Sequence, residues 1–285
     1  MNVRILIGDV RAKLAELPDE SVHCVVTSPP YFGLRDYGMD GQIGLEQTPA
    51  EFVAALVGVF REVHRVLRND GTLWLNLGDT SNNRRRIRST SHQPSLNGFA
   101  EPTWAEATIA GLTRLSVSTW GMKEKDAMGI PWAVACVLRA DGWFLRQEII
   151  WAKASGKPEP SVDRFPSRHE QIFLMSKSKR YFFDRASVPA WANRSVWEVP
   201  ATGSDQHGAA FPPALIEPCI LAGCPKGGTV LDPFGGAGTT GLVADRLGRS
   251  AILIELNPEY AAIAERRIKG DAGMFAEVKS IAAVA

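Results

Sequence analysis

An alternation of strand, helix and strand in the first 80 residues constrains the fold of this chain most. The runs Val22–Thr27 and Thr72–Leu77 are apolar and rich in β-branched residues, as buried strands are. Between them, apolar residues recur at helical spacing from Phe52 to Leu67, behind the capping-box sequence Thr48-Pro49-Ala50-Glu51. Because parallel strands need a crossover connection, which a helix commonly supplies, the pattern predicts a parallel sheet covered by helices.

The second half of the chain shows the same alternation. Thr229–Asp232 and Ser250–Glu255 are predicted strands, separated by a glycine-rich turn and a helix that ends at Leu247. Two further predicted strands, Trp143–Trp151 and Gln171–Ser176, are close enough in sequence for one of them to be antiparallel. We therefore expect an α/β fold with a mixed sheet, in a single domain that covers residues 1–285.

Composition agrees with a globular α/β domain. Of 285 residues, 45% are hydrophobic and 22% are charged, no apolar run is long enough to cross a bilayer, and the N-terminus lacks a signal-peptide pattern. We therefore expect a cytoplasmic protein without a membrane partner. The four cysteines are scattered without metal-ligand spacing, so we expect reduced thiols and no bound metal.

The segment 80–127 interrupts the alternation. It is rich in Ser, Asn, Arg, Gly and Pro, and four guanidinium groups fall within five positions, at Arg84, Arg85, Arg86 and Arg88. An irregular segment of this length in a compact domain is usually either functional or disordered, so we interpret it as an inserted functional segment. A solvated surface loop is the alternative. The Ala-rich tail 271–285 is predicted to be frayed.

Two prolines end the strand Val22–Thr27 abruptly, in the sequence Ser28-Pro29-Pro30-Tyr31. Proline cannot donate to a strand ladder, so this motif is expected at the edge of the sheet. A hydroxyl, free proline carbonyls and an aromatic ring together can hold a flat ring that bears an amino group. Strands that end near Ser and Tyr are also common in proteins without catalytic activity, so this motif alone leaves both interpretations open.

The strand Thr229–Asp232 runs into the turn Pro233-Phe234-Gly235-Gly236-Ala237-Gly238. Glycines let a ligand approach the backbone, and an acid that ends the next strand, here Glu255, can accept hydrogen bonds from both ribose hydroxyls. The turn carries no P-loop lysine, and a nucleoside cofactor without pyrophosphate is our expectation. S-adenosyl-L-methionine is the usual one. A tight turn between a core strand and its helix is the alternative.

The two motifs, in this order, resemble those of the β-class amino-methylating DNA methyltransferases, the family that methylates N4 of cytosine or N6 of adenine. The family's catalytic pattern is Asp, Asn or Ser, then Pro-Pro and an aromatic residue, and its cofactor pattern is similar to Asp232–Thr240. The resemblance covers most of the chain except 80–127. It implies a Rossmann-like methyltransferase domain that is circularly permuted, with strand order 3-2-1-4-5-7-6 and one antiparallel strand. It also implies S-adenosyl-L-methionine as methyl donor and 80–127 as a candidate target-recognition region.

The resemblance implies roles for the matched residues. A flipped-out base would be held by Ser28, Pro29, Pro30 and Tyr31, with the Tyr31 ring stacked on it. Asp9 would contact the cofactor adenine, although an acid there also commonly caps the following turn. The other cofactor-binding candidates are Phe211, Asp232, Pro233, Phe234, Gly235, Gly236, Gly238, Thr239, Thr240 and Glu255. The DNA-binding candidates are Arg84, Arg85, Arg86, Arg88, Lys153 and Lys157.

These residues predict site-specific methyl transfer to an exocyclic amino group in double-stranded DNA. Ser28 resembles the N4-cytosine members, so we favour cytosine N4 over adenine N6. A non-catalytic DNA-binding relative and a protein glutamine methylase are further alternatives, which the intact motif and the motif order respectively disfavour. Methylation of cytosine C5 would instead need a Cys nucleophile, and the cysteine nearest to the motif, Cys24, lies inside the strand before it. A cognate restriction endonuclease and a homodimer remain open as partners of a bacterial-type or phage-encoded enzyme.

Overall fold

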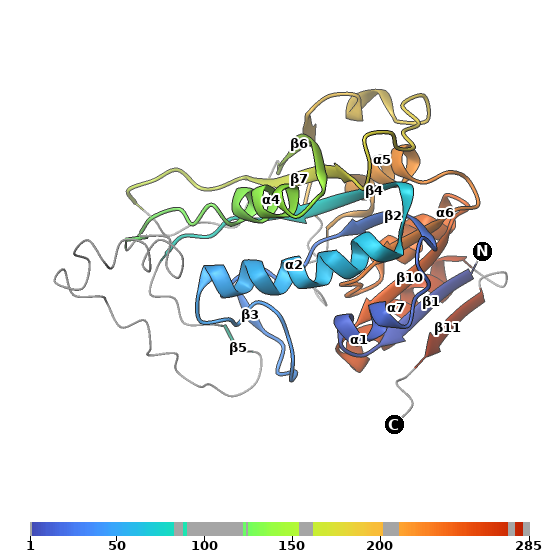
Figure 1. Ribbon diagram of the computed structural model, residues 1–285, viewed down its shortest axis with the longest axis horizontal. Coiled ribbons are helices and arrows are strands. Elements are labelled where there is room, and N and C mark those ends of the chain that lie inside the picture. The colour runs from blue at the N-terminus through green and yellow to red at the C-terminus, as the bar shows by residue number, and fades with distance from the viewer. Residues whose placement is uncertain are drawn as a thin grey trace.

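A computed structural model describes residues 2–82, 88–89, 122–123, 125–153, 162–201, 211–272 and 277–281. Within these residues nine strands form one sheet, which runs from β11 to β8 (Figure 1). In spatial order the strands are β11 (Glu277–Ile281), β1 (Asn2–Ile7), β10 (Ser250–Glu255), β9 (Thr229–Asp232), β2 (Val22–Thr27), β4 (Leu67–Leu77), β7 (His169–Ser176), β6 (Phe144–Ala152) and β8 (Val196–Glu198). A separate pair joins β3 (Arg35–Asp36) to β5 (Arg88–Ser89).

The strand order confirms the predicted permuted topology. Numbered as in that prediction, β1, β10 and β9 are strands 3, 2 and 1, and β2, β4, β7 and β6 are strands 4, 5, 7 and 6. β7 pairs antiparallel with both β4 and β6, and it is the one antiparallel strand in the described part of the sheet. Strands β2 and β9, which lead into the two motifs, are neighbours in the sheet although they lie far apart in the sequence.

The two edge strands are not predicted by the sequence. β11 pairs in parallel with β1, and β8 pairs in parallel with β6. The expectation of a frayed tail over 271–285 is wrong for Glu277–Ile281, because pairing there satisfies backbone groups that β1 would otherwise expose at the sheet edge. Val278 also packs into the core with only 8% of its surface exposed.

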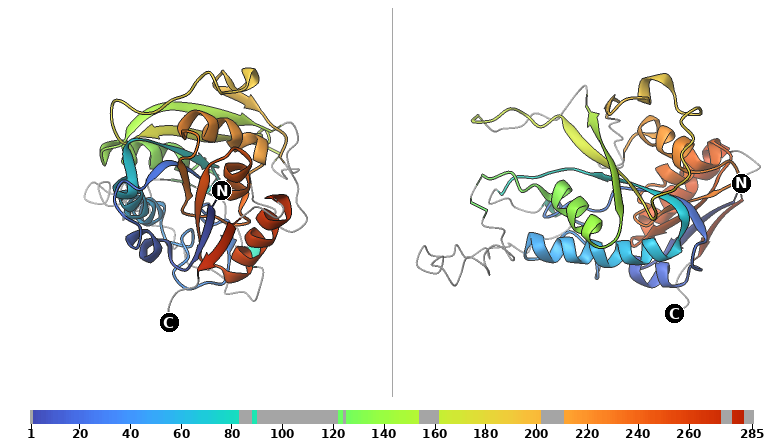
Figure 2. Two further views of the ribbon diagram at one scale, coloured as in Figure 1. Left: turned by 90° about the vertical axis from the view of Figure 1, so that its right-hand side faces the viewer. Right: turned by 45° about the horizontal axis from the view of Figure 1, so that its top comes forward.

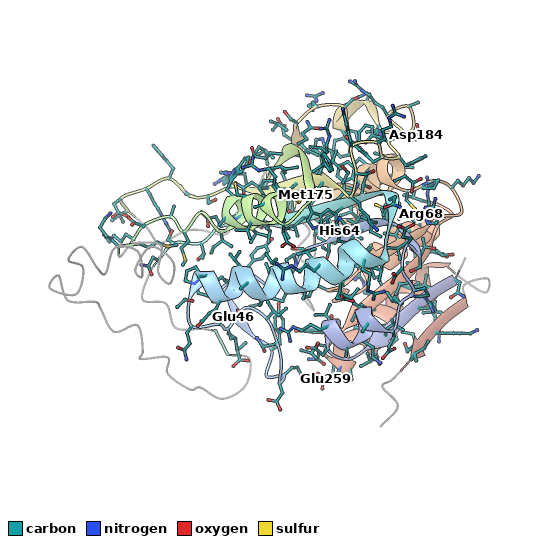
Figure 3. The ribbon with its side chains drawn as sticks, in the orientation of Figure 1. Glu46, His64, Arg68, Met175, Asp184 and Glu259 are labelled. Atoms are coloured by element: carbon teal, nitrogen blue, oxygen red, sulfur yellow. The ribbon has the colours of Figure 1, made fainter. Side chains whose placement is uncertain are left out.

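Helices cover both faces of the sheet, as the turned views show (Figure 2). On one face, α1 (Val10–Ala15), α2 (Pro49–Val66) and α4 (Ile130–Ala140) contribute to one hydrophobic cluster. On the other, α5 (Pro213–Gly223), α6 (Thr239–Arg246) and α7 (Pro258–Ala272) contribute to a second. A short 3₁₀ helix, η1, covers Ala190–Ala192. On the first face lies His64 of α2, which is labelled in Figure 3. It packs edge-on against Trp143, with ring centroids 5.0 Å apart.

The predicted capping box starts α2. The hydroxyl of Thr48 accepts from the N–H of Glu51, and the Glu51 carboxylate accepts from the N–H of Thr48. The helix ends at Val66, and β4 begins directly at Leu67, five residues before the predicted strand start. The turn signal Asn69-Asp70-Gly71 lies inside this early part of β4, so the signal misplaced the strand boundary without changing the order of elements.

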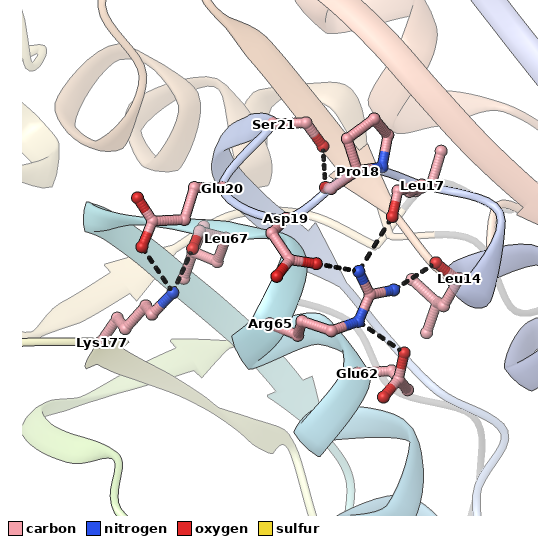
Figure 4. Close-up of polar contacts among 10 residues, drawn as sticks. All are labelled: Leu14, Leu17, Pro18, Asp19, Glu20, Ser21, Glu62, Arg65, Leu67 and Lys177. Atoms are coloured by element: carbon pink, nitrogen blue, oxygen red, sulfur yellow. Dashed lines mark hydrogen bonds and ion pairs between the residues drawn. The ribbon is translucent and has the colours of Figure 1, made fainter.

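Near its carboxyl end, α2 holds the connection between α1 and β2 through Arg65 (Figure 4). The guanidinium donates to the carbonyls of Leu14 and Leu17, at 2.8 and 3.0 Å. It also forms ion pairs with Asp19 and Glu62. Because the orphan carbonyls at the end of a helix need donors, Arg65 stabilises the end of α1 and fixes the chain that enters β2.

Candidate active site at the carboxyl edge of the sheet

The carboxyl ends of five neighbouring strands meet at one edge of the sheet, because β1, β10, β9, β2 and β4 all run parallel. β7 runs the opposite way, so its first residues reach the same edge. Ligands of open α/β sheets bind in the crevice at this edge, where the strand order reverses. Here the reversal falls between β9 and β2, the strands that lead into the glycine-rich turn and the Ser-Pro-Pro-Tyr motif.

The glycine-rich turn is held by Glu255, at the end of β10. Its carboxylate accepts from the N–H of Gly236 at 2.7 Å and from the N–H of Asn257 at 2.9 Å. Burial raises the pKa of Glu255, and these two N–H donors oppose the rise. Gly236 has φ of 49°, and the nearest atom to a Cβ built there is the Phe234 carbonyl oxygen at 3.9 Å. The turn therefore leaves open space beside its backbone, next to an acid with further lone pairs.

Asp232 is buried rather than open to a ligand. Its side chain accepts from the hydroxyl of Thr27 at 2.6 Å, from the hydroxyl of Thr240 at 2.7 Å and from the N–H of Phe234 at 3.1 Å. Only 2% of the residue is exposed. Burial raises the pKa of Asp232 to about 6, against the opposing effect of the two hydroxyls. Asp232 thus joins the turn to the strand that enters the Ser-Pro-Pro-Tyr motif.

Asp9 caps α1, which is the alternative that the sequence left open. Its side chain accepts from the N–H of Arg11 at 2.8 Å and of Ala12 at 3.4 Å. The side chain remains 32% exposed, and a Cβ on Gly41 would lie 3.4 Å from its Oδ2. Capping and ligand contact are therefore compatible at Asp9, and the loop that follows Tyr31 passes close to it.

The other cofactor-binding candidates lie around the same turn or in the core. Pro233, Gly235 and Gly238 are buried, Phe234 is half-buried, and Thr239 and Thr240 are buried at the start of α6. Gly238 has φ of 81° and lies against α7, where a Cβ would come within 2.7 Å of the Ala264 Cβ. Phe211 is 8% exposed and packs into the cluster beneath α5, α6 and α7.

The side chains at the ends of β2, β4 and β7 form one polar cluster around Tyr31. The Tyr31 hydroxyl donates to Glu170 Oε2 at 2.6 Å. The side-chain nitrogen of Asn76 lies 2.9 Å from the same oxygen, 3.0 Å from the Tyr31 hydroxyl and 3.3 Å from Ser28 Oγ. Burial, followed by the nearby Glu170 charge, raises the pKa of Tyr31. The cluster thus fixes Tyr31 at its hydroxyl end and keeps it protonated.

The ring of Tyr31 lies against Gly78, the first residue after β4. A Cβ at Gly78 would come within 2.6 Å of Tyr31 Cε2, so any side chain there would displace the ring. Of the four motif residues, Pro29 is buried, and Ser28, Pro30 and Tyr31 are half-buried.

Sequence reasoning missed Thr27, Asn76 and Glu170 as members of the site. Two of them had a signal, because Asn76 is polar inside an apolar strand and Glu170 directly precedes the predicted strand Gln171–Ser176. Neither signal shows that the two residues meet, which follows only from the antiparallel pairing of β4 with β7.

The structure does not describe most of the DNA-binding candidates. Arg84, Arg85, Arg86 and Lys157 lie outside the described residues, and Arg88 is described only as part of β5, which pairs with β3. Lys153 is described, and it forms an ion pair with Glu170. Its Nζ also lies 4.5 Å from the centroid of the Trp151 ring. The two ends of segment 80–127 lie side by side, since Ser81 bridges to Ala127.

Two absences hold for the described part of the chain. It contains no cluster of three or more His, Cys, Asp or Glu side chains that could hold a metal ion. None of its helices is both long enough and apolar enough to cross a membrane.

Comparison with known proteins gives the site a context. Residues 22–266 match the N6/N4 methyltransferase family model, described as DNA methylase. The chain is 46% identical to type II methyltransferase M.XycI of Xanthomonas campestris pv. cyanopsidis, over 92% of this chain and 86% of that protein. It is 43% identical to type II methyltransferase M.SmaI of Serratia marcescens, over 93% and 90%.

Two solved structures have the same fold. A putative DNA modification methylase of Thermus thermophilus, complexed with S-adenosyl-L-methionine, superimposes with a TM-score of 0.68 at 27% identity, over 98% of this chain and 99% of that one. The PvuII DNA methyltransferase, which is cytosine-N4-specific, superimposes with a TM-score of 0.69 at 23% identity, over 93% and 85%.

Proposed function

Because the chain belongs to the N6/N4 family of DNA methylases, we propose that it methylates N4 of a cytosine flipped out of duplex DNA. It is an S-adenosyl-L-methionine-dependent DNA methyltransferase of the type II, restriction-modification class. The observation that carries the proposal is the placement of Ser28 and Tyr31 one strand away from the glycine-rich turn, at the switch point of the sheet. Ser28 in this motif favours cytosine over adenine as the target base. A DNA substrate agrees with a bacterial-type protein that acts in the cytoplasm.

The residues at the switch point fit this cofactor. The open space beside Gly236 and the remaining lone pairs of Glu255 suit a ribose, and Asp9 suits the adenine amino group. Bound there, S-adenosyl-L-methionine supplies an electrophilic methyl group. Asp232 would hold the turn in place rather than contact the cofactor, because its carboxylate accepts hydrogen bonds from Thr27 and Thr240. We assign the walls of the pocket to Phe211, Pro233, Phe234, Gly235, Gly238, Thr239 and Thr240.

The motif residues would activate the amino group of the base. The amino lone pair of cytosine is delocalised into the ring and is a poor nucleophile. Hydrogen bonds from the amino group to Ser28 Oγ and the Pro29 carbonyl would draw the nitrogen toward tetrahedral geometry and free its lone pair. Pro30 holds the turn, and the Tyr31 ring would stack on the flipped base. Catalysis here is positioning and electrostatics, without a covalent enzyme intermediate.

The test uses labelled S-adenosyl-L-methionine and unmethylated genomic DNA, which contains many candidate sites. After the reaction, the DNA is digested to nucleosides. We expect label in N4-methylcytosine. Label in N6-methyladenine instead would overturn the choice of base, and no transfer to DNA would overturn the enzymatic assignment in favour of a non-catalytic DNA-binding relative.

A matched pair of variants tests the motif itself. Ser28→Ala should slow transfer at least about 100-fold while it leaves cofactor affinity unchanged. Ser21→Ala removes a hydroxyl that bonds only the Pro18 carbonyl, just before β2, and should transfer normally. Loss of cofactor binding in Ser28→Ala would contradict the assigned role.

We also propose that the segment 80–127 contacts DNA through Arg84, Arg85, Arg86 and Arg88, with Lys157 as a further contact. Arginines at phosphates make affinity fall with salt. Replacement of the four arginines by Gln should therefore weaken DNA binding and reduce its salt dependence, with cofactor affinity unchanged. Equal salt dependence in both proteins would count against this assignment. A partner endonuclease would cut the same sequence that this enzyme protects.

A further inference from the structure

A continuous path of hydrogen bonds leads from Ser28 away from the position of the base. Ser28 Oγ donates to the Tyr31 hydroxyl at 3.5 Å, and that hydroxyl donates to Glu170 Oε2 at 2.6 Å. Each of the two hydroxyls donates toward Glu170, so a proton that arrives at Ser28 can reach Glu170 in two successive transfers. The first link is long, as such contacts commonly are before substrate binds and tightens them.

The path ends at a carboxylate that is held in place. Glu170 has 13% of its side chain exposed, and its second oxygen forms an ion pair with Lys153, whose side chain is 22% exposed. Asn76 donates to Glu170 Oε2 from the other side at 2.9 Å. The carboxylate is therefore fixed in position beside its lysine partner, and it is still in contact with water along one side.

We propose that Ser28, Tyr31 and Glu170 form a relay that removes the proton from the amino nitrogen of the target base, with Glu170 as the acceptor. The inference rests on the proposed function, since it assumes that an amino group is bound at Ser28. As the nitrogen forms its bond to the methyl carbon, the bond from that carbon to sulfur breaks and its electron pair stays on sulfur. The N–H proton passes to Ser28 Oγ, the Ser28 proton to Tyr31, and the Tyr31 proton to Glu170.

Charge balances along this path. The base gains a methyl group and loses a proton, so it ends neutral, while the sulfonium charge and the Glu170 charge cancel. Glu170 then returns the proton to water at its exposed side. Because burial raises the pKa of Tyr31, its hydroxyl passes a proton on only as it receives one, and no free phenolate is needed.

The relay gives the Tyr31 hydroxyl a role distinct from stacking. If Tyr31 only stacks on the base, Tyr31→Phe keeps the ring and should transfer normally. If the hydroxyl is a link in the relay, Tyr31→Phe interrupts it, and Glu170→Gln removes the acceptor while it keeps the size of the side chain. Both variants would then slow the same step, which is removal of the proton from the amino nitrogen.

The experiment measures the single-turnover rate of methyl transfer with cofactor saturating and DNA already bound. We expect Tyr31→Phe and Glu170→Gln each to slow this rate about 100-fold, with DNA and cofactor affinities unchanged. The double variant should be no slower than either single one, because both interrupt one path. The solvent deuterium isotope effect on the rate should be larger in the wild type than in the variants.

Two control variants carry the same chemical changes outside the path. Tyr181→Phe removes a hydroxyl that accepts from Arg146, and Glu148→Gln changes a carboxylate that accepts from Trp132. Both should transfer at the wild-type rate. If Tyr31→Phe and Glu170→Gln also transfer within about twofold of an active wild type, the relay is wrong and the proposed function stands. If the wild type itself transfers no methyl to DNA, the proposed function fails first.

Discussion

The hydroxyl of Thr27 donates to Oδ1 of Asp232 at 2.6 Å, between residues 205 positions apart in the chain. Thr27 is the last residue of β2 and Asp232 the last of β9, so this buried bond joins the strand before the Ser-Pro-Pro-Tyr motif to the strand before the glycine-rich turn. The relative position of the two motifs therefore depends on this hydrogen bond as well as on sheet pairing.

Thr27→Val should weaken that link. The variant keeps the side-chain volume but removes a donor to a buried carboxylate, so we expect a loss of about 1–3 kcal/mol in the free energy of unfolding. Urea unfolding monitored by circular dichroism measures it. Thr229→Val, at the half-buried start of β9, is the control and should unfold near the wild-type midpoint. Equal midpoints for all three proteins would show that the bond contributes nothing.

Asp232 should make stability depend on pH. Burial raises its pKa from 3.8 to about 6, so between these values the folded protein binds a proton that the unfolded chain has released. Stability from this group is present at low pH and falls as pH rises through about 6, by about 3 kcal/mol at 1.36 kcal/mol per unit of pKa. The difference in unfolding free energy, wild type minus Asp232→Asn, should therefore fall between about pH 4 and pH 7.

Asp184 supplies a control of opposite sign for that measurement (Figure 3). The Ser187 hydroxyl lowers the pKa of this exposed carboxyl. The stability that Asp184 contributes is present at neutral pH and is lost as pH falls. The difference in unfolding free energy, wild type minus Asp184→Asn, should therefore rise with pH rather than fall. A rise with pH for Asp232→Asn as well would contradict the effect assigned to burial.

Gly78→Ala should reduce methyl transfer without unfolding the protein. The new Cβ would meet Tyr31 Cε2 at 2.6 Å, so the ring has to move and its hydroxyl shifts away from Glu170. We expect the transfer rate to fall at least about tenfold, as small misplacements at reacting groups usually cause. Gly58→Ala, in α2 with no atom within 4 Å of the new Cβ, should keep full activity and gain up to about 1 kcal/mol of stability.

Arg65→Met should destabilise the first half of the sheet. The change removes the guanidinium donor from the Leu17 carbonyl and one of several donors from the Leu14 carbonyl. It also removes the ion-pair partner of Asp19 and Glu62, and the expected cost is about 1–3 kcal/mol. Thermal unfolding of the variant measures this. Arg61→Met breaks only an exposed ion pair with Asp141 and should unfold close to the wild type. A larger effect at Arg61 than at Arg65 would refute the role given to the carbonyl contacts.

Local sequence signals predicted most of the strands, and the resemblance supplied their order. Thr48 and Glu51 mark the start of α2 by their own chemistry, and the apolar runs of β2, β9 and β10 leave little choice of structure. The edge strands escaped prediction because Glu277–Ile281 and Val196–Glu198 become strands only through the partner that they cover. Runs of three and five residues are too short for a local pattern to identify them as strands.

The same distinction separates the predicted from the missed site residues. Ser28, Tyr31, Gly236 and Glu255 belong to short motifs whose spacing carries the chemistry. Asn76 and Glu170 reach Tyr31 from two other strands, so their role depends on antiparallel pairing that no local pattern encodes. Lys153 was predicted to bind DNA from its charge alone, and that stays a prediction. The structure adds its ion pair with Glu170, which the sequence did not indicate.

The adjacency of β2 and β9 has a consequence for the newly synthesised protein. β2 leaves the ribosome early, but the strand that must lie beside it is made about two hundred residues later. Until then, β2 and β4 form half of a sheet whose inner edge is unpaired, and the methyl donor has no glycine-rich turn to bind. Protection of DNA therefore cannot begin on a partly translated chain, and the unpaired edge of β2 is a part of the nascent protein that needs shielding from aggregation.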